Sequence, residues 1–255
     1  MSEYIVGRNP VIERLRRASQ DVEKICIAKG STHSRIRQII AMAEQIGIPI
    51  RHCTRRELDR LEPSVPHQGV VAVIRSPHYT DLSSILAKIQ CSEHNALLVM
   101  LDGVQDPRNL GAILRTADAA NADAVIIPKN SAVGITAAVH KASAGASAYI
   151  PIVSVTNLAR TVDALKKAGI WVAGATGDAP CLYTDADFNI PLCLVLGSEG
   201  EGIRRLVKEK CDYLVHLPML GNIESLNVSV AVGVLLYEAL RQRGARNLSN
   251  KSLFL

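Results

Sequence analysis

Three groups of polar residues in the second half of the chain have types and spacings that could do chemistry. Each group comes where a strand-like apolar segment gives way to a turn or a helix, which is the usual place for a site in an α/β layer. Between them they offer amides, a guanidinium, a carboxylate and a hydroxyl, which can bind a polar substrate and stabilise a developing oxyanion. The groups lie at residues 109–116, 197–202 and 217–229.

The first group begins a predicted helix. Its apolar residues recur at the spacing i, i+3, i+4, i+7 and would face a core, and Asn109 could cap the helix. Gly111 lies one turn before Arg115 on the same face, so it would leave room for a phosphate or a ribose to reach the guanidinium. The alternative is a capped surface helix in which Arg115 pairs with Asp118. The apolar residues are Leu110, Ile113, Leu114 and Ala117.

The second group is a turn with three glycines, residues 197–202, after an apolar strand. Its order, Gly-x-x-Gly-x-Gly, differs from the dinucleotide fingerprint Gly-x-Gly-x-x-Gly, and Glu199 and Glu201 would repel a pyrophosphate. Both features disfavour a nicotinamide-dependent dehydrogenase. Glycines let the backbone approach an adenosine closely, and a cationic sulfonium cofactor without phosphate would tolerate the carboxylates. The alternative is that Gly202 only forms a tight turn into the next helix.

The third group precedes the last predicted helix, residues 226–241. Ser225 is a favourable N-cap for that helix. Asn227 would then lie in the first turn, where its helix propensity is poor, so its amide is expected to have a partner. The alternative is a local bond from that amide to the backbone.

The elements around these groups predict a mainly parallel sheet covered by helices on both faces, because continuous apolar strands alternate with helices. Expected strands cover 97–101, 124–127, 150–153, 171–173, 192–196 and 213–217, and expected helices cover 110–120, 135–146, 158–168, 203–208 and 226–241. The pattern indicates a Rossmann-like α/β domain over residues 96–255.

Residues 1–75 are predicted to form a small α/β domain with its own core, followed by a linker at 76–95. This first domain holds 13 Lys+Arg against 8 Asp+Glu, whereas residues 76–255 hold 16 of each. A basic module beside a neutral one favours binding of a polyanion. The alternative is an ordinary solvated basic surface.

The rest of the composition excludes several classes of protein. The apolar runs are too short to cross a bilayer, and the N-terminus lacks a secretory signal, so we expect a cytoplasmic protein without membrane contact. The six cysteines have neither zinc-knuckle nor Cys-x-x-Cys spacing, which favours free thiols and no metal site.

In this order and at these spacings, the three groups resemble the motifs of the SpoU, or TrmH-like, branch of the SPOUT RNA 2'-O-methyltransferases. The resemblance implies a SPOUT domain with a deep trefoil knot after about residue 190, and an N-terminal L30e-like domain that binds the RNA substrate. It also implies S-adenosylmethionine as cofactor and methyl transfer to a ribose 2'-hydroxyl.

Carried over residue by residue, the resemblance implies a polar catalytic set and a cofactor site. The catalytic set is Asn109, Arg115, Glu199, Ser225 and Asn227; the cofactor contacts are Thr176, Leu196, Gly197, Leu217, Met219 and Leu226.

The resemblance extends over nearly the whole chain and is strongest to two-domain bacterial members that act on a guanosine of 23S ribosomal RNA. It implies RNA, and specifically this rRNA, as partner and a homodimer formed through the knotted domain. Two alternatives stay open, a transfer RNA 2'-O-methyltransferase and a non-catalytic RNA-binding protein that has kept the fold.

Overall fold

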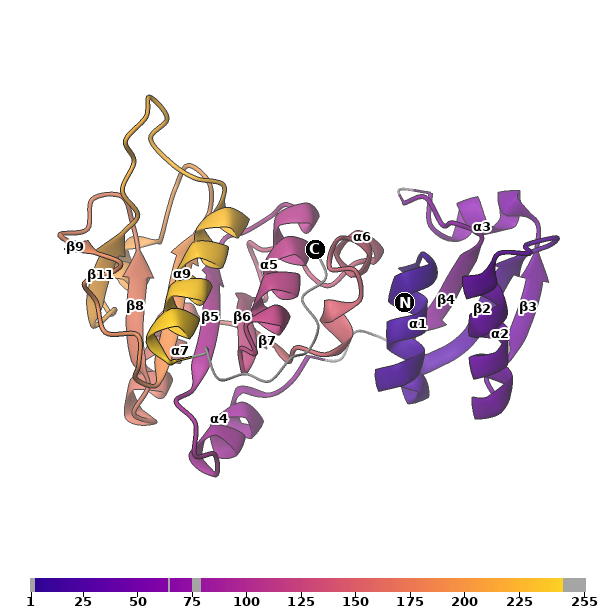
Figure 1. Ribbon diagram of the computed structural model, residues 1–255, viewed down its shortest axis with the longest axis horizontal. Coiled ribbons are helices and arrows are strands. Elements are labelled where there is room, and N and C mark those ends of the chain that lie inside the picture. The colour runs from indigo at the N-terminus through magenta and orange to yellow at the C-terminus, as the bar shows by residue number, and fades with distance from the viewer. Residues whose placement is uncertain (1–2, 64, 75–78, 245–255) are drawn as a thin grey trace.

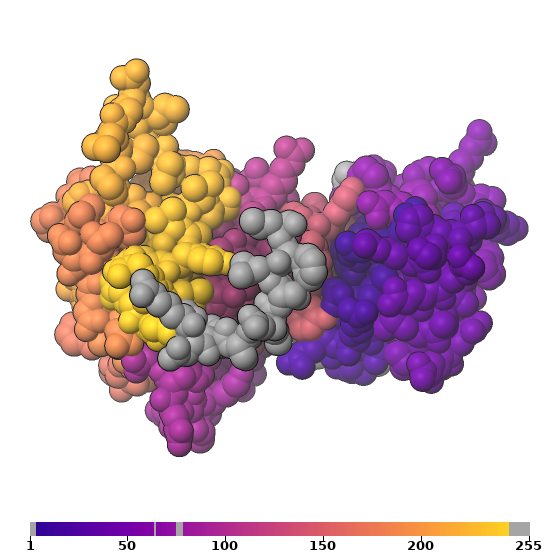
Figure 2. Space-filling view, viewed as in Figure 1, coloured from indigo at the N-terminus to yellow at the C-terminus, as the bar shows by residue number. Residues whose placement is uncertain are grey.

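The computed structural model describes residues 3–63, 65–74 and 79–244, and these form two α/β units that lie side by side (Figure 1). The smaller unit contains the N-terminal residues and the larger unit contains the rest of the chain. Figure 2 shows the indigo residues of the smaller unit packed against the rose-coloured middle of the chain along a narrow seam.

A seven-stranded sheet organises the larger unit. All its neighbouring strands are parallel, in the order β7-β6-β5-β10-β8-β11-β9. Its central strands β5 and β10 are apolar and buried up to their last residue, as expected for a sheet that is covered on both faces. The strands are β5 (Leu97–Asp102), β6 (Ala124–Pro128), β7 (Ile152–Val155), β8 (Trp171–Ala175), β9 (Cys181–Leu182), β10 (Leu192–Gly197) and β11 (Tyr213–His216).

Helices cover both faces of this sheet. On one face α5 (Pro107–Ala119) and α9 (Val228–Gln242) lie side by side over a shared apolar core (Figure 1). The other face is covered by α4 (Leu82–Gln90), α7 (Leu158–Lys167) and α8 (Arg205–Lys208). The parallel α/β sheet predicted from the sequence is therefore confirmed. The trefoil knot implied by the resemblance stays a prediction.

The smaller unit is a four-stranded sheet with three helices. Its strand order is β1-β4-β2-β3, and only the β2–β3 pair is parallel. Gly47, with φ of 79°, ends α2 and donates to the carbonyls of Ala43 and Glu44, as its place in the sequence predicts. The elements are β1 (Glu3–Val6), α1 (Arg8–Arg17), β2 (Val22–Ala28), α2 (Ser34–Ile46), β3 (Ile50–Cys53), α3 (Arg55–Leu61) and β4 (Val70–Ile74).

The helix α4 falls within the segment expected to be a linker, residues 76–95. It packs against the larger sheet through Ile85, which is 3% exposed, together with Leu82, Leu86 and Ile89. This part of the segment therefore contributes to the core of the larger unit. The domain limits at 75 and 96 stay a prediction.

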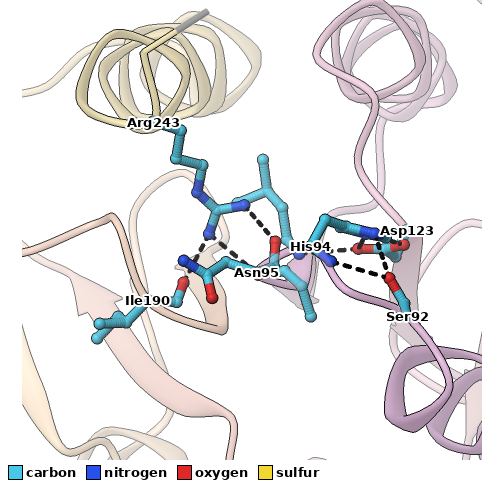
Figure 3. Close-up of polar contacts among 8 residues, drawn as sticks. Ser92, His94, Asn95, Asp123, Ile190 and Arg243 are labelled. Carbon is cyan, nitrogen blue, oxygen red and sulfur yellow. Dashed lines mark hydrogen bonds and ion pairs between the residues drawn. The ribbon is translucent and has the colours of Figure 1, made fainter.

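The end of α9 is held by the guanidinium of Arg243 (Figure 3). It donates to the carbonyls of Asn95 (2.7 Å) and Ala96 (3.0 Å), which lie before β5, and to those of Phe188 (2.9 Å) and Ile190 (2.7 Å), which lie before β10. Desolvation by burial lowers the pKa of Arg243. One side chain thus joins the C-terminal helix to the starts of the two central strands.

The seam between the units is formed mainly by α1 and β1 on one side and by α6 (Ala137–Ala142) with the turn after it on the other. His140 of α6 is 2% exposed, and its Nδ1 is 2.7 Å from the Ser147 hydroxyl. Its Nε2 is buried and has no hydrogen-bond partner among the described residues. Burial, and secondarily the nearby charge of Arg14, lowers the pKa of His140 to about 3.

None of the helices in the described ranges combines the length and apolar character needed to cross a membrane.

We predict that Arg243→Ala lowers the free energy of unfolding by about 3 kcal/mol, because four carbonyls at the base of the sheet lose a charged donor. The measurement is urea unfolding followed by circular dichroism. Arg205→Ala is the control, because Arg205 and its partner Glu209 are both exposed and lie one turn apart along the chain; its loss should cost less than about 1 kcal/mol. Equal losses in the two variants would contradict a clamping role for Arg243.

We also predict that acid destabilises the protein through His140. Between pH 6.5 and about 3 the unfolded chain binds a proton on this residue that the folded chain does not, so stability falls as the pH drops, with a slope approaching about 1.4 kcal/mol per pH unit. His140→Gln should remove the His140 contribution to the dependence of the unfolding free energy on pH. The free energy is measured by urea unfolding at pH 7, 6 and 5. His52→Gln, at an exposed position, should retain this contribution. An unchanged slope in His140→Gln would refute the assignment.

Candidate functional site

The three polar groups meet at the carboxyl edge of the larger sheet. Asp102 ends β5 and pairs in register with Gly197, which ends β10. The neighbouring strands β8 and β11 end beside them, at Ala175 and His216. Since parallel strands end at one edge, the loops that follow them are brought together.

Glu199 joins all three groups. Its Oε1 accepts a hydrogen bond from Nδ2 of Asn109 at 3.1 Å and from Nδ2 of Asn227 at 2.7 Å. The Nδ2 of Asn227 also donates to Oδ1 of Asn109 at 3.0 Å. The backbone N–H of Val228 lies 3.5 Å from the same carboxylate oxygen. Side chains 118 positions apart in the sequence thus form one connected cluster, which we call the Glu199 cluster (Asn109, Glu199 and Asn227).

Asn227, not Ser225, is the N-cap of α9. Its Oδ1 accepts from the backbone N–H of Ser229 at 2.9 Å and from the Ser229 hydroxyl at 2.5 Å. The expectation that Ser225 caps the helix is therefore wrong, because the helix begins at Val228. Ser225 lies exposed in the connection that rises between β11 and α9 (Figure 1). The expectation that the Asn227 amide has a partner is confirmed, and its oxygen also makes the local bond given as the alternative.

The first group also differs in detail from its sequence interpretation. Asp106 caps α5 through the N–H of Arg108 at 2.7 Å, with Pro107 as the first helical residue. Asn109 is therefore inside the first turn, and its expected capping role is wrong. Gly111 is buried, and a Cβ on it would lie 2.3 Å from the Cβ of Ala142. Its lack of a side chain allows α6 to pack on α5; it does not open space beside Arg115.

The Glu199 cluster borders a cleft of about 460 Å³ that is rich in carboxylates. Asp102, with a fully buried side chain, binds the side chain of Arg204 at 2.6 Å and its backbone N–H at 2.9 Å. The negative charge of the carboxylates that line the cleft would repel a polyphosphate. This agrees with the order of the glycines, which differs from the dinucleotide fingerprint. It is lined by Asp102, Gly103, Val104, Gln105, Asp106, Asn109, Ser131, Ser198, Glu199, Glu201, Gly202, Arg204 and Val228.

Sequence reasoning missed Asp102 and Arg204. The signal available for Asp102 was its position, since it is the first acidic residue after the apolar run 97–101. Nothing in the sequence links it to Arg204, which is 102 residues away.

The turn after β10 is closed by direct contact between its glycines. A Cβ on Gly197 would lie 1.8 Å from the carbonyl carbon of Gly202, and Gly202 itself has φ of 66°. A side chain on Gly197 would therefore collide with the backbone of Gly202 and Ile203, so glycine is needed at this position for the turn to close.

The remaining cofactor residues expected from the sequence follow neighbouring strand ends or lie in the connection after β11. Thr176 follows β8, and Leu196 lies in β10. Leu217 follows β11, and Met219 and Leu226 are partly exposed in the 217–227 connection. The Thr176 hydroxyl donates to Asp178 at 2.5 Å, and Asp178 also pairs with Lys208 at 2.8 Å. Both bonds lower the pKa of Asp178, to about 2, and the bond from Lys208 has the larger effect.

Together these residues form an edge of apolar side chains and backbone groups at three adjacent strand ends. These groups suit a ligand that combines an adenosine, an uncharged sugar and a cationic sulfonium.

Arg115 lies away from the Glu199 cluster within one chain. It is exposed and lines a different cleft, at the seam between the two units. Asn109 and Arg115 are six residues apart on α5, which at 100° per residue directs their side chains to different sides of the helix. Asp118, the alternative partner of Arg115, lines the same seam cleft.

The chain is similar over nearly its whole length to known methyltransferases. The family model described as the SpoU rRNA Methylase family matches residues 96–237, and the one described as RNA 2'-O ribose methyltransferase substrate binding matches residues 4–80. The putative TrmH family tRNA/rRNA methyltransferase YacO of Bacillus subtilis is 44% identical, over 94% of this chain and 96% of its own length. The 23S rRNA (guanosine-2'-O-)-methyltransferase RlmB of Pseudomonas syringae is 46% identical, over 96% and 97%.

Solved structures share the whole architecture. The crystal structure of the SpoU methyltransferase AviRb from Streptomyces viridochromogenes in complex with the cofactor AdoMet has a TM-score of 0.80 at 26% identity, covering 95% of this chain and 90% of that one. A structure described as an RNA 2'-O ribose methyltransferase has a TM-score of 0.76 at 29% identity, covering 94% and 88%.

Proposed function

The chain belongs to the SpoU family of RNA methyltransferases, and from this premise we propose that it methylates the ribose 2'-hydroxyl of a guanosine in 23S ribosomal RNA. The observation that carries the proposal is the Glu199 cluster, which unites the three motif segments at one edge of the sheet. The similarity to RlmB over almost the full length of both chains supports this substrate. An rRNA substrate implies a cytoplasmic protein.

RNA is the appropriate acceptor because it alone carries a 2'-hydroxyl. The unit that matches the substrate-binding family model is the basic part of the chain. Basic residues around a structured RNA neutralise phosphates, which supplies much of the binding free energy.

The cofactor S-adenosylmethionine fits the strand ends described above. When bound, it supplies an electrophilic methyl group. Gly197, Leu217 and Leu226 are proposed to contact it through backbone groups, and Thr176, Leu196 and Met219 to complete the site. The carboxylates Glu199 and Glu201 favour a cationic ligand nearby and repel phosphates.

The chain's own polar residues have to position the hydroxyl, whose proton passes to a phosphate of the RNA or to water as the oxygen attacks. We assign orientation of the ribose to the Glu199 cluster and to Ser225, whose side chains offer both donors and acceptors. Arg115 offers a planar guanidinium with five N–H donors and no acceptor, so we assign it to a phosphate and to stabilisation of the developing oxyanion.

A second copy of the chain is needed to bring these groups together. Within one chain Asn109 and Arg115 line different clefts. The outer face of α9 exposes Val230 and Tyr237, which are 50% and 56% exposed, beside the apolar connection that includes Leu220 and Ile223. Apolar side chains gathered in this way mark an interface. We therefore propose a homodimer in which Arg115 of one chain completes the site of the other.

The function is tested by incubating the protein with tritiated S-adenosylmethionine and either a 23S rRNA transcript or a transfer RNA transcript. We expect label in the 23S transcript, recovered as 2'-O-methylguanosine after digestion and mass mapping. Label in transfer RNA alone would replace the proposed substrate. Tight RNA binding with no label in either transcript would identify a non-catalytic RNA-binding protein.

The shared site is tested by complementation. Arg115→Ala and Asn227→Ala should each abolish methyl transfer, and Arg115→Ala should still bind the cofactor in calorimetry. When equal amounts of the two variants are co-expressed, half of the dimers are mixed and each mixed dimer has one intact site, so about a quarter of the wild-type activity returns. No recovery from purified mixed dimers would show that both residues must act within one chain.

A further inference from the structure

A second cleft, of about 470 Å³, lies at the seam between the two units. We call it the seam groove. Its walls come from α1 and α2 of the smaller unit and from α5 and the turn after α6 of the larger unit. It is lined by Asn9, Ile12, Glu13, Arg16, Arg35, Gln38, Arg115, Asp118, Ser143, Ala144, Gly145, Ala146 and Tyr149.

Close contact through Glu13 holds the two walls together. The Tyr149 hydroxyl donates to the Glu13 carboxylate. Gly145 has φ of 104°, and a Cβ on it would lie 2.8 Å from the Cβ of Glu13 and 2.6 Å from its Cγ. Glycine is needed at this position both for its backbone conformation and for the approach of α1. The groove is therefore formed only when the two units are docked.

The groove carries three guanidiniums from three helices. Arg16 is paired with Glu13 at 3.0 Å, and its side chain is 53% exposed. Arg35 bonds to the amide oxygen of Asn9. Arg115 is exposed at the opposite wall. Guanidiniums present planar pairs of donors that match phosphate oxygens.

Two carboxylates oppose these cations. The pKa of Asp118 is raised, chiefly by burial and in addition by the negative charge of Glu13. The Glu13 carboxylate therefore has two effects. It holds the two units together through Tyr149, and its negative charge affects the other charged groups of the groove.

We propose that the seam groove binds the phosphodiester next to the nucleotide that is methylated, through Arg16 and Arg35 of one unit and Arg115 of the other, and that Glu13 weakens this binding. The proposal rests on the proposed function, because Arg115 is what connects the groove to the reacting ribose. It assigns Arg16 and Arg35 as positioning residues for RNA. It also explains why the substrate-binding unit is docked through α1 beside α5.

The first experiment measures RNA binding without any methyl transfer. A 23S rRNA fragment is bound to full-length protein in filter assays at several salt concentrations. Arg16→Ala and Arg35→Ala should each weaken binding about tenfold and reduce the salt slope by about 1. The matched control is Arg37→Ala, which removes an exposed arginine on α2 that does not line the groove; its effect should be less than about twofold. Equal effects of Arg35→Ala and Arg37→Ala would overturn the proposal.

The second experiment tests the sign of the Glu13 contribution. Glu13→Gln keeps an acceptor for the Tyr149 hydroxyl but removes the charge beside the groove, so RNA should bind about threefold more tightly. Tyr149→Phe removes the hydroxyl without changing the charge, and it should not increase affinity. Weaker binding by Glu13→Gln would overturn the proposed opposition between this carboxylate and the phosphate.

A third measurement separates this inference from the proposed function. When methyl transfer is measured over a range of RNA concentrations up to saturation, Arg16→Ala and Arg35→Ala should retain most of kcat. Their KM for RNA should be raised, whereas their affinity for the cofactor should be unchanged. If wild-type protein transfers no methyl group but the binding results hold, the function fails and the groove stands as a binding site for RNA phosphate. If methyl transfer holds and the groove variants bind RNA normally, the groove fails and the function stands.

Discussion

The organisation of the candidate site depends on one carboxylate oxygen. Oε1 of Glu199 accepts the amides of Asn109 and Asn227, which belong to helices that start 121 positions apart in the sequence. A carboxylate at this position can hold two amides in fixed orientation because it has only acceptors to offer and an amide nitrogen has two donors. The site is therefore preorganised by bonds between protein groups before any ligand is present, which is the condition for electrostatic stabilisation of a transition state.

Preorganisation of this kind requires the backbone segments to come very close together. Three glycines allow this close approach at three places in the structure. Gly197 closes the turn on which Glu199 lies, Gly111 allows α6 to pack on α5, and Gly145 allows the smaller unit to dock on the larger one. In each case an added Cβ would lie within 3 Å of another residue. The glycine turn thus serves the site directly, whereas Gly111 allows close packing on α5, the helix that carries both Asn109 and Arg115, and Gly145 allows the approach of α1.

The chain carries two clefts of opposite character, one within the larger unit and one at the seam between the units. The cleft beside the Glu199 cluster contains four carboxylates, one of which, Asp102, is neutralised by Arg204. The seam groove contains three guanidiniums opposed by two carboxylates. A cationic cofactor and a polyanionic substrate need such opposite surroundings, and α5 connects them, with Asn109 directed to the first and Arg115 to the second. The same division explains why one chain alone does not assemble the complete polar set.

The amino-acid sequence by itself determined the alternation of apolar strands and helices, the parallel sheet, and the three segments that carry the chemistry. These are properties of local pattern, because periodicity and turn residues act over a few positions. The pattern misplaced the N-caps of α5 and α9, since Asp106 and Asn109, or Ser225 and Asn227, are equally acceptable capping residues by type. Only the tertiary structure decided which of them caps, that Gly111 serves helix packing, that Asp102 binds Arg204, and that Arg115 faces the smaller unit. Each of these depends on contacts between residues distant in sequence, whose free energies arise from packing and burial that no local pattern records.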